Sequence, residues 1–267
     1  MLGKLARFIR SSTASPVMQD SLLTRIEVTV GNQIHTAPAF FDSLLPATKA
    51  ALAYFERQVA ALPGPLAMLP GPLFAHAGEI SQAMGCSLAV KKSLEKFPAD
   101  GEIHALLGMR RKPTAQNLAD HTLHCLASSA EACREQICLA ALDRLLGNFA
   151  EHLHKLQRSD RMQRMALEGD PSAAEAAEAS PPPAELATVT PELMPENIVK
   201  GLQSWLAAPE SYLRIDPPAA ATDDAPALPL LHCSDRRQWL TCLVSFPAAE
   251  AAVALQNEKH NHRYILI

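Results

Sequence analysis

The sequence contains few aromatic residues and few glycines, and both shortages narrow the possible folds. Phe, Trp and Tyr make up 5% of the chain, and there are 11 glycines among 267 residues. Ala and Leu are abundant instead. Because sheets favour aromatic and β-branched side chains and helices favour Ala and Leu, this composition favours helix packing. The scattered glycines form no phosphate-binding loop.

Several signals of particular functions are also missing. No run of about eighteen apolar residues occurs, so the sequence predicts no membrane-spanning helix. There is no Gly-x-Ser-x-Gly elbow for a nucleophilic serine and no His-Glu-x-x-His zinc motif. The net charge of −4 gives no general attraction to nucleic acid, which we do not expect as a partner.

The six cysteines form no Cys-x-x-Cys pair. No secretory signal opens the chain, because the apolar part of the N-terminus is short and is interrupted by Lys4 and Arg7. We therefore expect reduced, mostly buried cysteines and a cytoplasmic location.

The longest helical pattern lies between Ser129 and Met165. Apolar residues recur in steps of three and four, which places one narrow seam along a helix. This seam consists of Leu139, Leu142, Leu146, Phe149, Leu153 and Leu156. Ser128 and Glu131 have the spacing of a capping box at the helix start. We expect this helix to be the spine of a helical bundle.

The fold class that follows is mainly α. We expect further helices over 46–62, 100–109 and 114–127. A β-hairpin is predicted over 22–36, because Ile26, Val28 and Val30 alternate with polar residues and Gly31-Asn32 supplies a two-residue turn.

The domain organisation follows from a change in composition near residue 168. Residues 1–167 are predicted to form the helical body that carries the hairpin. Residues 168–195 are rich in Ala, Pro and Glu, and no basic residue occurs between Arg164 and Lys200, so we expect a disordered linker. Residues 196–267 are predicted to form a small α+β element with an internal loop over 216–229. Strands are expected over 212–215, 238–246 and 263–267, and a helix over 248–258.

One candidate metal site lies in the predicted helix over 114–127. His121, His124 and Cys125 have i, i+3 and i+4 spacing, which puts all three on one helical face. A metal would need a further ligand, and the same residues would equally serve as polar packing groups. Cys125 near His121 is also the one local thiol–imidazole pair that could support thiol catalysis.

A second candidate is a zinc site in the C-terminal element. Cys233, Cys242, His260 and His262, with His232 beside them, supply enough nitrogen and sulfur ligands. Their spacing does not match the usual zinc fingers, and Cys242 lies in a predicted core strand. The sequence therefore gives zinc little support.

Two basic segments allow other contacts. Residues 1–10 form a short amphipathic pattern that predicts a packed N-terminal helix, a peripheral membrane anchor or an organelle-targeting segment. Arg110, Arg111 and Lys112 could bind phosphate, but a solvated helix end explains them as well.

With no catalytic motif, the sequence favours a non-enzymatic interaction or adaptor protein. We expect it to present helical surfaces, with the seam as the candidate contact, to a protein partner or to a second copy. A metal-dependent or thiol enzyme that uses His121, His124 and Cys125 is the alternative. Peripheral membrane association through residues 1–10 is the second alternative.

Overall fold

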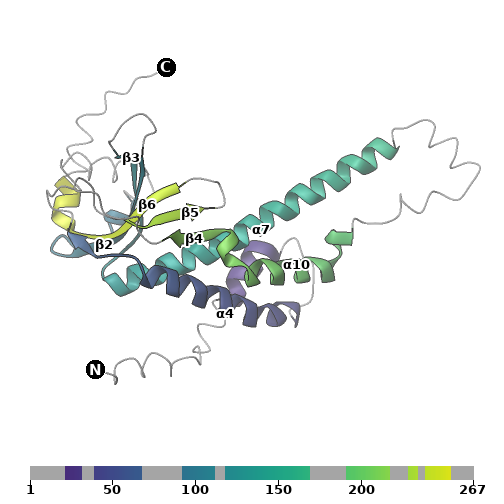
Figure 1. Cartoon of the computed structure of the whole chain (residues 1–267), viewed down its shortest axis with the longest axis horizontal. Coiled ribbons are helices and arrows are strands. Elements are labelled where there is room, and N and C mark those ends of the chain that lie inside the picture. The colour runs from purple at the N-terminus through teal and green to yellow at the C-terminus, as the bar shows by residue number, and fades with distance from the viewer. Residues whose placement is uncertain are drawn as a thin grey trace, which may run out of the picture. The chain divides into compact units, whose positions relative to one another are not determined.

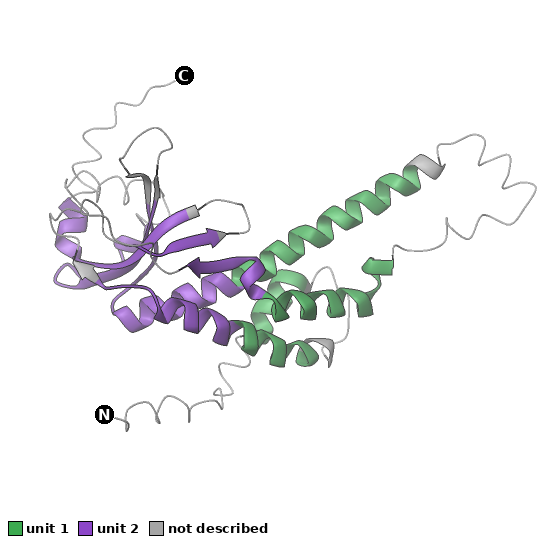
Figure 2. Cartoon of the chain, in the orientation of Figure 1, with its two compact units in different colours: residues 1–51, 143–208 green, residues 52–142, 209–267 purple. Residues whose placement is uncertain are grey.

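The structure of this protein is a computed structural model, which describes residues 22–31, 39–67, 92–111, 118–168, 191–216, 228–233 and 238–253. The chain divides into two compact units, which Figure 2 shows in different colours. Unit 1 comprises residues 1–51 and 143–208, and unit 2 comprises residues 52–142 and 209–267. Two of the three boundaries fall within helices α4 (Ala39–Ala60) and α7 (Ala130–Glu168), labelled in Figure 1, so each of these helices contributes to both units.

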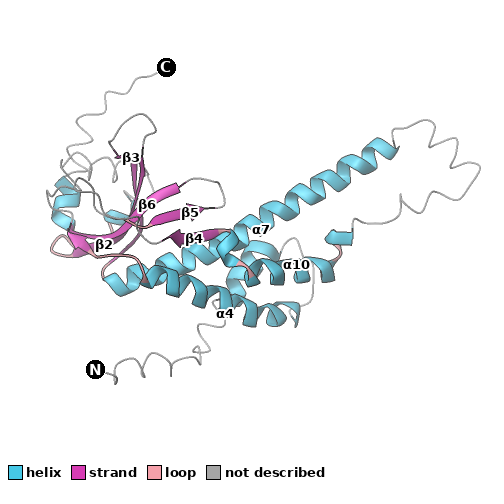
Figure 3. Ribbon diagram, viewed as in Figure 1, coloured by secondary structure: helices cyan, strands magenta, loops and turns pink. Residues whose placement is uncertain are grey.

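Unit 2 contains a sheet, whose strands are magenta in Figure 3. Five strands follow the order β3-β2-β6-β5-β4, and all neighbours on this path are antiparallel. They are β2 (Glu102–Arg111), β3 (Leu118–Ala127), β4 (Leu213–Asp216), β5 (Leu230–Cys233) and β6 (Gln238–Pro247). The short strand β1 (Leu66–Ala67) pairs in parallel with β6. The sheet therefore joins strands from the middle and from the C-terminal part of the chain.

One face of this sheet lies in an apolar core. Alternate residues of β2 and β6 share that face, as the two-residue period of a strand requires. The core residues from these strands are Ile103, Ala105, Leu107, Met109, Cys242, Val244 and Phe246, and Leu94, Leu228, Ala248 and Ala251 pack with them. The intervening positions are also buried, since Leu106 and Leu243 are 8% and 1% exposed. The central strands are thus covered on both faces.

Unit 2 also holds the first part of α7 and the last part of α4. Ser129 caps the start of α7, because its Oγ accepts a hydrogen bond from the Ala132 N–H (3.1 Å). The cap is thus one residue later than the predicted capping box at Ser128. The expected long helix itself is confirmed, as α7 runs from Ala130 to Glu168.

The described part of unit 1 consists of helices. Residues 22–31 are helical and end in the π-helix η2 (Glu27–Gly31). The other helices are the first part of α4, the distal part of α7, the short 3₁₀ helix η3 (Pro191–Leu193) and α10 (Pro195–Ala207). Phe149 of α7 packs edge-on against Trp205 of α10, with ring centroids 5.3 Å apart. Gly201 of α10 faces the same ring, and a Cβ there would make an ordinary contact with Phe149 at 3.5 Å. An aromatic contact therefore joins these two helices.

The predicted mainly α bundle with an N-terminal hairpin is wrong, since the described chain is α+β with a five-strand antiparallel path. Residues 22–31 are helical rather than a hairpin arm. Leu22, Ile26 and Val30 are spaced four apart and are 2%, 0% and 0% exposed, whereas Val28 is 74% exposed. The helical period therefore prevailed over the two-residue alternation.

The helices predicted over 100–109 and 114–127 are strands β2 and β3. Strand β2 is buried on both faces, and such a strand loses the polar alternation that identifies a strand in a sequence. The predicted strand over 238–246 is confirmed as β6 (Gln238–Pro247), and Leu213–Asp216 forms β4 close to its expected place. Of the linker predicted over 168–195, residues 169–190 lie outside the described residues, whereas residue 168 ends α7 and residues 191–195 hold η3 and the start of α10. Most of the loop over 216–229 and the strand over 263–267 also lie outside the described residues.

Candidate functional site

The predicted seam of α7 is largely buried within the chain. Leu142, Leu146, Phe149 and Leu153 are at most 2% exposed, and Leu139 and Leu156 are partly buried. Burial of a narrow seam with this spacing is what helix packing requires. The side chains at its centre therefore belong to the core, and a partner would have to use another surface of α7.

Such a surface lies beyond Leu153, on the distal part of α7. From His154 to Met165 every side chain is exposed or only partly buried. At about 100° per residue, Arg158 lies roughly 180° around the helix from the buried Phe149. Six exposed residues share the side centred on Arg158, and one of them is His154. We call the other five the distal α7 face: Lys155, Arg158, Arg161, Met162 and Met165. Their exposure follows from this position, since the opposite side of the helix carries the seam.

The distal α7 face combines positive charge with apolar surface. Among the described residues, no ion pair involves Lys155, Arg158 or Arg161. Met162 and Met165 are 61% and 58% exposed, unusually high values for large apolar side chains. The face is thus available for contact through three cations and two thioethers.

The neighbouring charges of α7 are already paired along the helix. Arg164 donates to Asp160 (2.9 Å) with i, i+4 spacing, and this pair lies on the side nearer the seam. Arg144 lies 3.9 Å from Glu151, and Glu151 is one turn before Lys155, the first residue of the distal α7 face. These pairs leave the positive charge concentrated on the three residues of the face.

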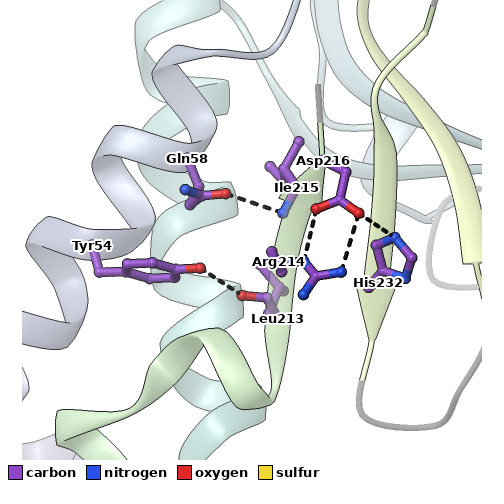
Figure 4. A network of polar contacts seen from close by, with 7 residues as sticks. All are labelled: Tyr54, Gln58, Leu213, Arg214, Ile215, Asp216 and His232. Atoms are coloured by element: carbon purple, nitrogen blue, oxygen red, sulfur yellow. Dashed lines mark hydrogen bonds and ion pairs between the residues drawn. The ribbon is translucent and has the colours of Figure 1, made fainter. Parts of the chain in front are cut away.

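A polar network occupies the outer strand of the sheet in unit 2 (Figure 4). Arg214 and Asp216 are two residues apart on β4, and His232 on the neighbouring strand β5 lies opposite Arg214. All three side chains therefore share one face of the sheet. Arg214 donates to both carboxylate oxygens of Asp216, at 2.7 and 3.1 Å. His232 Nε2 lies 2.9 Å from Asp216 Oδ2. The hydrogen bonds from Arg214 hold the pKa of Asp216 below its usual value.

In the same network, two side chains of helix α4 cover the backbone edge of strand β4. The Tyr54 hydroxyl donates to the Leu213 carbonyl oxygen (3.3 Å), and the Ile215 N–H donates to Gln58 Oε1 (3.0 Å). Tyr54 and Gln58 lie one turn apart on α4, so they reach alternate backbone groups of β4. Because Asp216 pairs with both Arg214 and His232, and α4 covers the backbone of β4, the network fits edge protection and cross-strand pairing better than ligand binding.

The helical spacing that suggested the candidate metal site does not apply, because His121, His124 and Cys125 lie on strand β3. His124 Nε2 lies 3.0 Å from the Thr122 hydroxyl, and Cys125 has a positive φ of 55°. His104 pairs with Ala127 and Leu106 with His124, so β3 bulges by one residue beside Cys125. The His121 side chain lies outside the described part of the chain.

The described thiols are held in their neutral form. Burial raises the pKa of Cys125 to about 12, and nearby Cys133 contributes to this increase. Burial also raises the pKa values of Cys133, Cys138 and Cys242 to about 11, 12 and 12. A catalytic cysteine requires the opposite shift, because the thiolate is the nucleophile.

The C-terminal zinc candidates are not brought together in the part of the chain that the structure describes. Cys242 is buried in the core of the sheet, and His232 faces Asp216. The Cys233 side chain, His260 and His262 lie outside the described residues. No three His, Cys, Asp or Glu side chains among the described residues lie together as metal ligands would.

Residues 1–10 and the side chains of Arg110, Arg111 and Lys112 also lie outside the described residues. Sequence analysis singled out the seam of this helix and proposed no residue of the distal α7 face as a functional residue. It missed the Arg214–Asp216–His232 network entirely. The i, i+2 spacing of Arg214 and Asp216 was visible, but their partner depends on the register of β4 and β5.

No family model, no curated protein and no solved structure matches this chain. Among the described helices, none combines the length and the apolar character that crossing a membrane demands.

Proposed function

We propose that this chain is a non-enzymatic intracellular interaction protein that presents a helical surface to a protein partner. The observation that supports this proposal is the distal α7 face. The helix continues to Glu168, although Leu153 is its last buried side chain among those described. A helical extension that buries no large apolar side chain gains little stability from packing on its own chain. A partner that covers Met162 and Met165 would supply this missing burial.

The thiol-enzyme alternative has less support. Its nucleophile would be Cys125, and the pKa near 12 leaves almost no thiolate at neutral pH. The four described free cysteines fit a reducing compartment instead, which agrees with the intracellular proposal.

Site-specific photo-cross-linking in the native cell tests the proposed function. A benzophenone side chain would replace Met162, and in a matched control it would replace Val28, which is 74% exposed on another helix of unit 1. We expect a discrete protein adduct from position 162 and a much weaker one from position 28. Equal labelling at both positions, or none at 162, would reject the distal α7 face as a partner surface.

A further inference from the structure

We propose that the distal α7 face binds an acidic, amphipathic segment of a partner protein. This inference rests on the proposed function and specifies the chemistry of the partner. Lys155, Arg158 and Arg161 are exposed and have no ion pair among the described residues, in a chain whose net charge is −4. A local cluster of cations in an acidic protein attracts a negatively charged surface.

The spacing of the cations suits another helix. Each step of three residues advances about 4.5 Å along the helix, so the three charges span about 9 Å. Acidic residues at i and i+3 or i+4 on a facing helix have the same spacing. Carboxylates on such a segment could therefore meet the three cations in register.

The methionines favour a protein over other anionic partners. Met162 and Met165 lie among the cations and need an apolar counterpart. A phosphodiester backbone offers none, and the distal α7 face lacks the aromatic residues that stack on bases. An interfacial membrane helix needs a wide apolar face with residues such as Leu, Phe or Trp, and this face has two thioethers flanked by charges. Methionine is a flexible side chain that adapts to protein surfaces.

A second copy of this chain is a poor partner for the same face. Symmetric pairing of two distal α7 faces would bring like charges together, because neither copy contributes a carboxylate from the face. The partner must therefore supply the negative charge from a different sequence.

Binding of defined probes to the full-length chain tests this inference. The first probe is a fluorescent helical peptide of about twenty residues, with Glu on one face and Leu beside it. The other probes are a twenty-base-pair DNA duplex and lipid vesicles in which phosphatidylserine makes up one third of the lipid. We expect the peptide to bind more tightly than the DNA or the vesicles, with an affinity that falls as salt increases.

Three variants identify the surface. We expect the charge reversal Lys155→Glu, Arg158→Glu and Arg161→Glu to weaken peptide binding at least about tenfold. Met162→Ser with Met165→Ser should weaken it about fivefold. The matched control reverses three exposed lysines elsewhere, Lys92→Glu, Lys96→Glu and Lys200→Glu, and should stay within about twofold of the original chain.

Tighter binding of DNA or vesicles, or equal losses in the charge-reversal variant and its control, would overturn the inference. The cross-link from position 162 separates the two proposals. If that cross-link persists unchanged in the charge-reversal variant, the proposed function stands and the acidic partner is wrong. If the original chain forms no protein cross-link at 162, the proposed function itself fails.

Discussion

Arg134 shows how one side chain stabilises the end of another helix in unit 2. From α7 its guanidinium donates to the carbonyl oxygens of Val59 (2.5 Å), Leu62 (3.3 Å) and Gly64 (3.3 Å), at and after the end of α4. The last carbonyl groups of a helix have no partner within the helix, and a cation is favourable at its negative end. A single charged residue thus stabilises the C-terminal end of α4 and the residues that follow it.

We expect Arg134→Met to lower the free energy of unfolding by about 2 kcal/mol, because it removes three charge-assisted hydrogen bonds and keeps most of the side-chain volume. Chemical denaturation measures the change. Arg134→Lys is the control, since it retains the charge and should lose only about half as much. A loss below about 0.5 kcal/mol for Arg134→Met would show that water replaces the guanidinium without cost.

The two outer strands of the sheet are protected in different ways. Along β4, Tyr54 and Gln58 of α4 bond to the backbone groups of Leu213 and Ile215. Along β3, the register with β2 shifts twice, and Cys125 adopts a left-handed backbone beside one shift. A covering helix and a bulged strand both hinder pairing with another chain, so each edge has its own protection.

We expect Gln58→Leu to increase amide hydrogen exchange at Ile215 by roughly fivefold, because the Ile215 N–H loses its acceptor and one such bond contributes about 1 kcal/mol. Gln58→Glu keeps an acceptor oxygen and should leave the rate near that of the original chain. Exchange followed by NMR at this amide makes the test. Equal rates in all three proteins would mean that the side chain does not protect this edge.

At the scale of the whole molecule, unit 2 contains four thiols whose pKa values are raised to about 11 or 12 from the ordinary value of 9.0. Above pH 9 the unfolded chain loses these protons while the folded chain keeps them. The contribution of the thiols to stability is therefore fully present below pH 9 and is lost as the pH rises towards 11 to 12. Alkaline solution should thus destabilise unit 2.

We expect each buried thiol to cost about 1.4 kcal/mol of unfolding free energy at pH 10 relative to neutral pH. Denaturation at pH 7, 8, 9 and 10 measures the dependence. Cys125→Ala is the control, because it removes one of the four thiols and should reduce the loss at pH 10 by about that amount. An identical pH dependence in this variant would assign the alkaline loss to other groups.

The functional proposal also belongs to the whole molecule, because it assigns two roles to one helix: core packing and partner contact. The seam of α7 was predictable from sequence, since its three-and-four spacing extends over several turns. Whether the seam is core or contact surface was not predictable, because that depends on what packs against it. Burial of Leu142 to Leu153 moves the candidate surface to Lys155, Arg158, Arg161, Met162 and Met165.

The sequence by itself determined the elements whose pattern is long and local: α7, with its sustained seam, and β6, whose β-rich run ends at a proline. The tertiary structure decided the rest. Residues 102–111 became a strand because apolar groups cover both faces of the sheet there, and residues 22–31 became a helix because Leu22, Ile26 and Val30 bury together. The Arg214–Asp216–His232 network exists only through the register of β4 with β5. Burial and register depend on residues that are distant in the chain, and no local period encodes them.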